Sequence, residues 1–270
     1  MLLTADALII RVVSGGDHDR ILTALTRDLG RITILAKGGR SVHSNQLALC
    51  QPYVYANLEL YQKGDMYWLR GGTATCRFYH VTADLDSLNL ATYLCDVAYD
   101  VSGEGVSCET LLRLLLNTLY ALDAGKKDTR LVKAAFEWRV AVEEGYEPDL
   151  SGCAVCGRTE SELMYLNVMN GNLTCPDCLR TFSVTQAQLD AEEGVRSVIV
   201  PLHENARLSF AYLAHADLSK LLSFNLPEPD LCELSHAAET YLLNHLERGF
   251  DSLDFYKSML AAAQPLKKDE

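Results

Sequence analysis

The chain has 270 residues, 49% of them hydrophobic, and a formal net charge of −12 at pH 7. This length is sufficient for one large or two modest domains with cores of their own. The negative total disfavours a protein that binds nucleic acid over its whole surface, because phosphates attract cations. No secretory signal or membrane-spanning run is evident, so we expect a soluble cytoplasmic protein without membrane contact.

The charge is unevenly distributed along the chain. Residues 1–80 contain nine Lys and Arg against six Asp and Glu, a net charge of +3, whereas residues 81–270 carry −15. Because salt screens charges beyond about 10 Å, a local basic surface can bind anions on a chain that is acidic overall. The sequence therefore places any phosphate-binding surface in the first part.

Residues 1–80 predict β-structure. In PYVYANLELYQ, Val54, Ala56, Leu58 and Leu60 alternate with polar and tyrosine residues, which is the period of a strand with one buried face. The runs ALIIRVV, RILTALT, GRITILA and MYWLRGG are similar, and glycine-rich or Asx-rich turns separate them. Five such strands predict a small barrel or sandwich.

From residue 81 the apolar period becomes helical. Helices are predicted over 85–97, over 108–125 with Gly125 as the stop, and over 128–146 with Asp128 as the cap. Shorter helical patterns follow at 186–193 and 218–224, then longer ones at 229–249 and 252–263. The sequence thus predicts an α+β protein with two domains, a β-domain over 1–80 and a helical domain over 81–270.

A cysteine segment over 150–182 interrupts the helical pattern. Cys153 and Cys156 form one closely spaced pair, and Cys175 and Cys178 form the second. Four thiolates at this spacing predict tetrahedral coordination of Zn²⁺, and a site of four cysteines leaves no open position for catalysis. A structural zinc clip is favoured, and direct contact with nucleic acid or protein is the alternative.

Enzyme signatures are missing from the sequence. No phosphate-loop, dinucleotide-binding, nucleophile-elbow or zinc-hydrolase motif occurs, and the histidines are scattered. We therefore expect no enzyme, with an unrecognised active site as the least favoured alternative. The cysteines outside the clip are expected to be buried core thiols: Cys50, Cys76, Cys95, Cys108 and Cys232.

The segment from residue 20 to residue 40 concentrates basic side chains. Its glycine-rich stretch Lys37-Gly38-Gly39-Arg40 either cradles phosphate or is a mobile hairpin connection. Aromatic residues nearby either stack on bases or pack against the next domain. These aromatic residues are Tyr53, Tyr55, Tyr61 and Trp68, and the candidate DNA-binding cations are Arg20, Arg27, Arg31, Lys37 and Arg40.

Several segments in this order resemble the RecO family of bacterial recombination-repair mediators. They are DHDRILTALTRDLGRITILAKGGRS at 17–41, QPYVYANLELYQKGD at 51–65, AFEWRVAVEEGYEPDLSGCAVCG at 135–157, TCPDC at 174–178 and YLLNHLERGFDSLDFYKSML near the end. The resemblance implies an N-terminal OB-fold, a helical C-terminal domain and a zinc element that some members lack. It also implies that basic residues of the barrel bind DNA, and Arg31, Lys37 and Arg40 occupy the matching strand and loop.

The resemblance also implies a function without bond chemistry. Members bind single- and double-stranded DNA, anneal complementary strands and help RecA replace single-stranded-DNA-binding protein, which implies a nucleoid-associated location. The implied partners are RecR and the acidic tail of single-stranded-DNA-binding protein. Arg130, Lys133 and Arg139 are candidates to bind that tail, or they form a solvated helix face. The rival hypothesis is a protein-interaction adaptor without intrinsic DNA binding.

Overall fold

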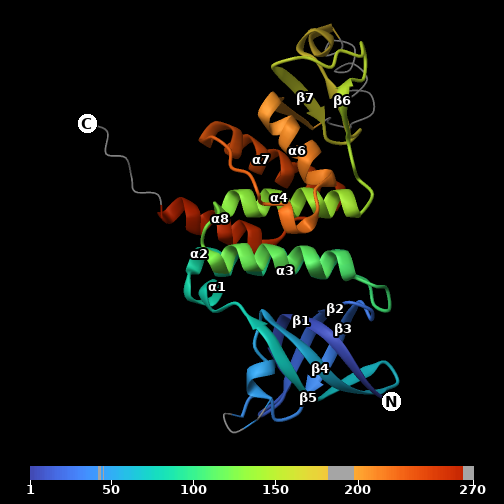
Figure 1. The fold of residues 1–270 in the computed structure, drawn as a ribbon, viewed down its shortest axis with the longest axis vertical. Coiled ribbons are helices and arrows are strands. Elements are labelled where there is room, and N and C mark those ends of the chain that lie inside the picture. Colours follow the sequence, from blue (N-terminus) through green and yellow to red (C-terminus); the bar gives the residue numbers. More distant parts are fainter. Residues whose placement is uncertain (42–43, 45, 182–197, 264–270) are drawn as a thin grey trace, which may run out of the picture. The chain divides into compact units, whose positions relative to one another are not determined.

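The computed structural model describes residues 1–41, 44, 46–181 and 198–263 (Figure 1). The helical pattern predicted at 186–193, and the end of the predicted cysteine segment at residue 182, lie outside these residues. Contacts group the chain into two compact units. Unit 1 comprises Met1–Lys126 and the chain from Phe250 onward, and unit 2 comprises Lys127–Gly249.

Unit 1 begins with a closed five-stranded barrel, as the OB-fold expectation requires. The strand order is β1-β2-β3-β5-β4, and β3 and β5 pair in parallel while the other pairs are antiparallel. The five strands are β1 (Leu2–Ser14), β2 (Arg20–Thr26), β3 (Arg31–Ala36), β4 (Val54–Lys63) and β5 (Met66–Arg77).

The predicted alternation fixes the inner face of the barrel. Leu58 and Leu60 of β4 are fully buried, and they pack with Ile34 of β3 and Leu69 of β5 in the barrel core. Tyr53 follows the alternative in which the aromatic residues are packed and not available to bases, because its side chain is buried. Its backbone has φ 59°, and its hydroxyl lies 2.9 Å from the hydroxyl of Thr92, which fixes the ring away from solvent.

Four helices complete unit 1: α1 (Tyr79–Ala83), α2 (Leu85–Val101), α3 (Glu109–Ala124) and α8 (Asp251–Ala263). Asp84 caps α2 by accepting a hydrogen bond from the backbone N–H of Ser87, and Gly125 ends α3 in the left-handed conformation as predicted. The ring of Tyr93 on α2 meets that of Phe250 edge to face at 5.7 Å, which places α8 beside α2 (Figure 1).

The barrel is attached to these helices at the turn between β2 and β3. The N–H of Arg31 donates to the carbonyl of Gly103, and the N–H of Gly105 donates to the carbonyl of Leu29. Gly30 has φ +71°, and a Cβ there would lie 2.3 Å from the Gly103 oxygen. A glycine is therefore required at this point, because backbone atoms cannot yield as a flexible side chain can.

Unit 2 contains the helices α4 (Thr129–Glu143), α6 (Glu204–His215) and α7 (Glu228–His245) and a four-stranded sheet of order β6-β8-β7-β9. Asp128 caps α4 as predicted. The pattern at 218–224 forms only the short 3-10 helix Leu218–Lys220. The strands are β6 (Asp149–Cys153), β7 (Leu163–Asn167), β8 (Asn172–Thr174) and β9 (Ile199–His203); β9 and α6 were not predicted.

The substitution Gly30→Ala tests the attachment of the barrel to the helices. We expect the free energy of unfolding to fall by about 3 kcal/mol, since left-handed strain and a backbone clash add. Gly64→Ala is the matched control, because Gly64 also has positive φ but nothing lies within 4 Å of the added carbon. It should lose about 1 kcal/mol. If urea unfolding gave equal losses of stability for both variants, the close approach of Gly30 to Gly103 would contribute nothing.

Candidate functional site

The four cysteines predicted to bind metal lie together in unit 2. All four sulfur atoms lie within 4.8 Å of one another, and the Sγ atoms of Cys156 and Cys175 are 3.8 Å apart. A tetrahedral ion with thiolates at about 2.3 Å needs sulfur separations of about 3.8 Å. The residues present therefore fit a metal ion held by Cys153, Cys156, Cys175 and Cys178.

Two tight turns bring the pairs together. The N–H of Gly157 donates to the carbonyl of Cys153 at 2.8 Å, with Gly157 at φ +74°, so the first pair faces one point. The strands β7 and β8 pair antiparallel and return the chain to the second pair. The N–H of Cys175 then donates to the sulfur of Cys153 at 3.3 Å, as backbone amides do around thiolate ligands.

The surroundings shift the pKa values of Cys153 and Cys178 in opposite directions. Burial favours the protonated form of Cys153, but the backbone of Cys175, Cys156 and Val155 outweighs it and lowers the Cys153 pKa to about 6. Burial, with hydrogen bonds to the other three thiols, raises the pKa of Cys178 to about 12. A bound metal must displace the remaining protons, because the thiolate is the ligand.

The other cysteines follow the prediction only in part. Cys50, Cys95 and Cys108 are buried and Cys76 is half-buried, but Cys232 is exposed on α7. The expectation of a core thiol is therefore wrong for Cys232. Its sulfur lies 3.5 Å from a nitrogen of Arg130, on a helix face rich in polar side chains.

The predicted DNA-binding cations divide into two groups. Lys37 and Arg40 follow β3 in an exposed loop, and their side chains form no ion pair with any residue that the structure describes. The N–H of Gly38 donates to the carboxylate of Asp19, and the N–H of Arg40 donates to the carbonyl of His18. These bonds fix the loop backbone while the two cationic side chains remain in solvent.

The remaining three cations have partners within unit 1. The guanidinium of Arg31 lies 3.9 Å from the ring centroid of Tyr99 on α2 and donates to the Tyr99 carbonyl. Arg20 donates to the carbonyl of Cys50. Arg27 is 3.6 Å from Asp6 and keeps 48% of its side chain exposed. Arg31 and Arg20 therefore stabilise the fold, and Arg27 is partly neutralised.

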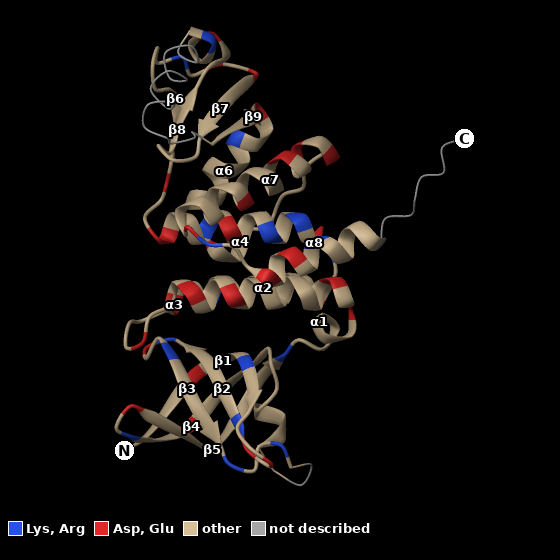
Figure 2. Cartoon of the chain, turned by 180° about the vertical axis from the view of Figure 1, so that it is seen from behind, with Lys and Arg blue, Asp and Glu red and all other residues tan. Residues whose placement is uncertain are grey.

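A cavity on the barrel contains residues that were not among the predicted cations. It has a volume of about 330 Å³ and is lined by Lys37, Gln46, Tyr61, Lys63, Trp68, Leu69 and Arg70, and we call it the β4–β5 cavity. Figure 2 shows basic segments on the barrel. The sequence could have identified Lys63 and Arg70 as candidates, since each lies two residues from an aromatic residue on the same strand and so shares its face.

The cations proposed for an acidic partner tail serve the fold of unit 2. The side chain of Lys133 is 3% exposed, and its ammonium lies 2.9 Å from Glu137 and 2.7 Å from Glu239. Burial would lower the pKa of Lys133, but the two carboxylates raise it above its ordinary value, so it remains charged. Removing one partner of such a group would leave an uncompensated buried charge.

Arg130 and Arg139 are also paired. Arg130 binds Asp128 at 2.7 Å and Glu228 at 2.5 Å, which links α4 to α7. Arg139 binds Glu143 at 2.8 Å and donates to backbone carbonyls at the end of α6, the nearest being that of Ala214 at 2.7 Å. Cations at a helix C-terminus satisfy carbonyls that lack partners within the helix.

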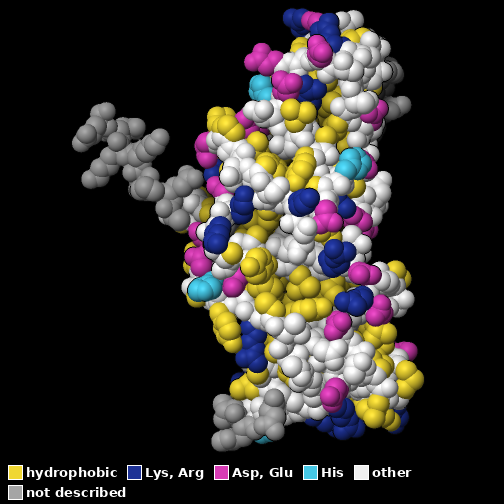
Figure 3. Space-filling model, viewed as in Figure 1, with side chains coloured by type: hydrophobic (Ala, Val, Ile, Leu, Met, Phe, Trp, Pro, Cys, Tyr) yellow, Lys and Arg dark blue, Asp and Glu magenta, His cyan; other side chains and the backbone are white. Residues whose placement is uncertain are grey.

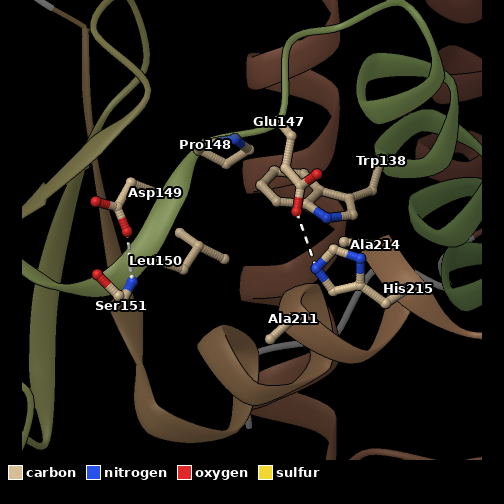
Figure 4. Close-up of a pocket in the computed structure, with 9 residues that line it drawn as sticks. All are labelled: Trp138, Glu147, Pro148, Asp149, Leu150, Ser151, Ala211, Ala214 and His215. Carbon is tan, nitrogen blue, oxygen red and sulfur yellow. Dashed lines mark hydrogen bonds and ion pairs between the residues drawn. The ribbon is translucent and has the colours of Figure 1, made fainter.

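Unit 2 has a larger cavity of about 510 Å³, drawn in Figure 4. The buried Trp138 forms part of its wall, and Glu147 points toward His215, with 3.0 Å between the carboxylate and the ring nitrogen (Figure 4). Asp149 lies on the same rim and accepts a hydrogen bond from the N–H of Ser151. The two carboxylates repel phosphates and acidic peptides, so this cavity does not suit DNA or an acidic tail.

Two features therefore define the class of the protein: a closed barrel with a local cationic surface, and a helical unit with a cluster of four cysteines that fits a metal ion. Among the described residues, none of the helices is both long and apolar enough to cross a membrane. Comparison with known sequences agrees with this class. Residues 1–77 match the family described as Recombination protein O N terminal, and residues 82–254 match Recombination protein O C terminal.

Individual relatives extend the match over nearly the whole chain. A DNA repair protein RecO from Acetivibrio thermocellus is 30% identical over 95% of this chain and 97% of its own length. One from Alkaliphilus metalliredigens is 26% identical over 96% of this chain and 100% of its own. One from Dehalococcoides mccartyi is 31% identical over 65% of this chain and 69% of its own. The chain belongs to the RecO family of DNA repair proteins.

The substitution Cys175→Ser tests the metal clip. We expect metal content, measured by atomic emission, to fall from about one ion per chain to near zero, because tetrahedral binding needs all four thiolates. Unit 2 should also unfold at a lower temperature, since metal binding contributes on the order of 10 kcal/mol to such folds. Cys232→Ser removes an exposed thiol outside the cluster and should change neither. A stable, metal-free Cys175→Ser protein would contradict the structural role.

Proposed function

We propose that this protein is a non-enzymatic recombination mediator that binds single- and double-stranded DNA and anneals complementary strands. One observation carries the proposal. Lys37 and Arg40 lie exposed at the end of β3, on the part of the chain with positive net charge, in a chain that belongs to a DNA repair family. Neither side chain forms an ion pair among the described residues, and the nearby carboxylate of Asp19 accepts a hydrogen bond from the N–H of Gly38, so both cations can bind phosphates.

Annealing follows from charge neutralisation alone. Two complementary strands repel each other through their phosphates, and a basic surface lowers that repulsion and raises their local concentration. No bond forms or breaks in the protein, so no catalytic residue is required. In this account Lys37 and Arg40 contact phosphates, Arg27 contributes through its exposed part, and Arg20 and Arg31 hold the strands that carry them.

We further propose that the protein acts with RecR to assist RecA loading on DNA covered by single-stranded-DNA-binding protein, in the cytoplasm at the nucleoid. The contact of Arg130, Lys133 and Arg139 with the acidic tail of that protein stays a prediction. Each of the three would have to exchange partners within unit 2, and Lys133 would have to release two carboxylates. The barrel and loop need no such exchange.

We assign the metal of the cysteine clip as structural zinc. Four thiolates at tetrahedral spacing suit this ion, and they leave no position for water or substrate. The domain assignment that we propose is a DNA-binding barrel over 1–80 and a helical domain over 81–270. The family matches divide the chain between residues 77 and 82, whereas the compact units place α1, α2 and α3 with the barrel.

The double substitution Lys37→Glu with Arg40→Glu tests the proposed surface. Fluorescence anisotropy with a single-stranded oligonucleotide should show weaker binding, slower annealing and a smaller dependence on salt. The slope of log K against log salt is about −0.7 per phosphate contact, so it should become less negative by about 1.4. The matched control, Arg113→Glu with Lys126→Glu, makes the same charge change at exposed positions on and after α3.

The outcomes separate the two hypotheses. Equal losses of affinity in the test and control variants would reject the loop as the binding surface. Failure of the unaltered protein to bind even at low salt would favour the protein-interaction adaptor instead.

A further inference from the structure

The outer face of the β4–β5 hairpin gathers aromatic and cationic side chains. Tyr61 and Lys63 are two residues apart on β4, and Trp68 and Arg70 are two residues apart on β5, so each pair shares a face of its strand. Tyr61 is the cross-strand partner of Trp68. Leu60 and Leu69, the alternate residues, are buried in the barrel core, which directs the four side chains outward.

The rings of Tyr61 and Trp68 do not cover each other's faces. The centroids of Tyr61 and Trp68 are 6.1 Å apart and the rings are inclined by 50°, so they do not stack. The guanidinium of Arg70 lies over the Tyr61 ring, 5.3 Å from its centroid. Both rings are half-buried and line the β4–β5 cavity. A planar ligand on Trp68 therefore does not have to displace Tyr61, whereas on Tyr61 it would compete with the guanidinium of Arg70 for a ring face.

Charge and hydrogen-bonding capacity surround this aromatic pair. Lys37, Lys63 and Arg70 are exposed at the cavity, and the acids of the same hairpin are Glu59 and Asp65. The amide of Gln46 donates to the carbonyl of Arg70 at 2.9 Å. Its oxygen is buried and has no partner among the described residues. Gln46 thus lines the cavity with one buried acceptor that has no partner among the described residues.

We propose that the β4–β5 cavity is a stacking subsite for an unpaired base of single-stranded DNA. The base stacks on Trp68 beside Tyr61, and Lys37, Lys63 and Arg70 bind the flanking phosphates. The volume of about 330 Å³ is at the small end of ligand pockets, which run from about 300 to 1,000 Å³, and suits a single nucleotide. Figure 3 shows cationic and hydrophobic side chains next to one another on the lower part of the barrel.

This inference rests on the proposed DNA binding and adds a preference for single strands over duplexes. Phosphate contacts alone hold single strands and duplexes by charge, whereas a stacking subsite requires a base that is free of its partner. A mediator with such a subsite holds one strand with at least one base unstacked. Lys37 belongs both to the loop and to the cavity, so the phosphate surface continues into the subsite.

The test uses the full-length protein and two oligonucleotides of about ten nucleotides, a length within the range that OB-folds cover. One is oligothymidine, and the other is an abasic strand with the same number of phosphates. Trp68 and Trp138 are the two tryptophans of the chain, and Trp138 is 1% exposed. Oligothymidine should quench the tryptophan fluorescence, the abasic strand should not, and Trp68→Phe should abolish the quenching.

Affinity measurements with variants complete the test. Trp68→Ala should weaken oligothymidine binding by about 5- to 150-fold, the value of one lost base stack, and should leave abasic binding unchanged. Trp68→Phe should recover most of the affinity, because a ring is retained. Tyr120→Ala removes a 68% exposed ring from α3 and should have no effect. If Trp68→Ala does not fold, the quenching and a Tyr61→Leu variant decide.

The outcomes separate this inference from the proposed function. Equal affinity for both oligonucleotides, with loss of binding in Lys37→Glu with Arg40→Glu, would overturn the stacking subsite and leave DNA binding by phosphates intact. Absence of binding to either oligonucleotide would overturn both.

Discussion

The stacking of Arg11 and Arg31 on Tyr99 determines which cations the barrel can offer to a ligand. Arg11 and Arg31 lie 4.6 and 3.9 Å from the ring centroid, and Arg11 also pairs with Asp96 at 2.9 Å. The carboxylate of Asp96 neutralises Arg11, and the ring and carbonyl of Tyr99 hold the guanidinium of Arg31 against α2. Arg31 begins β3 and Lys37 follows its last residue, a separation of about 20 Å at strand spacing. The far end of the strand therefore keeps its charge for solvent.

This division explains how an acidic chain can belong to a DNA repair family. The two cationic groups of the barrel differ in their neighbours: one contacts helices of its own unit, and the other lies between β3 and the β4–β5 hairpin. Coulomb attraction to phosphates acts over about 10 Å at moderate salt. Acidic side chains beyond that range affect the local surface weakly.

Sequence patterns correctly predicted those features that depend on residues close together in the chain. Alternation along β4 predicted its buried face, Asp128 and Gly125 predicted helix ends, and the cysteine spacing predicted the four-cysteine cluster. Side-chain partners contributed by distant segments could not be predicted. Tyr53 fits the exposed period but is buried against α2, and Lys133 fits a polar helix position but is held by Glu239 from another helix. Such outcomes depend on tertiary packing. The hydrophobic period of one segment does not show which distant segments pack against it.

The most direct measurement is hydrogen exchange of the full chain with and without a single-stranded oligonucleotide. A bound oligonucleotide slows the exchange of backbone amide hydrogens where it prevents local opening of the protein or keeps out water. If the barrel carries the DNA-binding surface, protection should appear in residues 37–41 and in the hairpin from Tyr61 to Arg70, while α4 and α7 exchange as before. Protection confined to residues 127–249, with the barrel unchanged, would contradict the account.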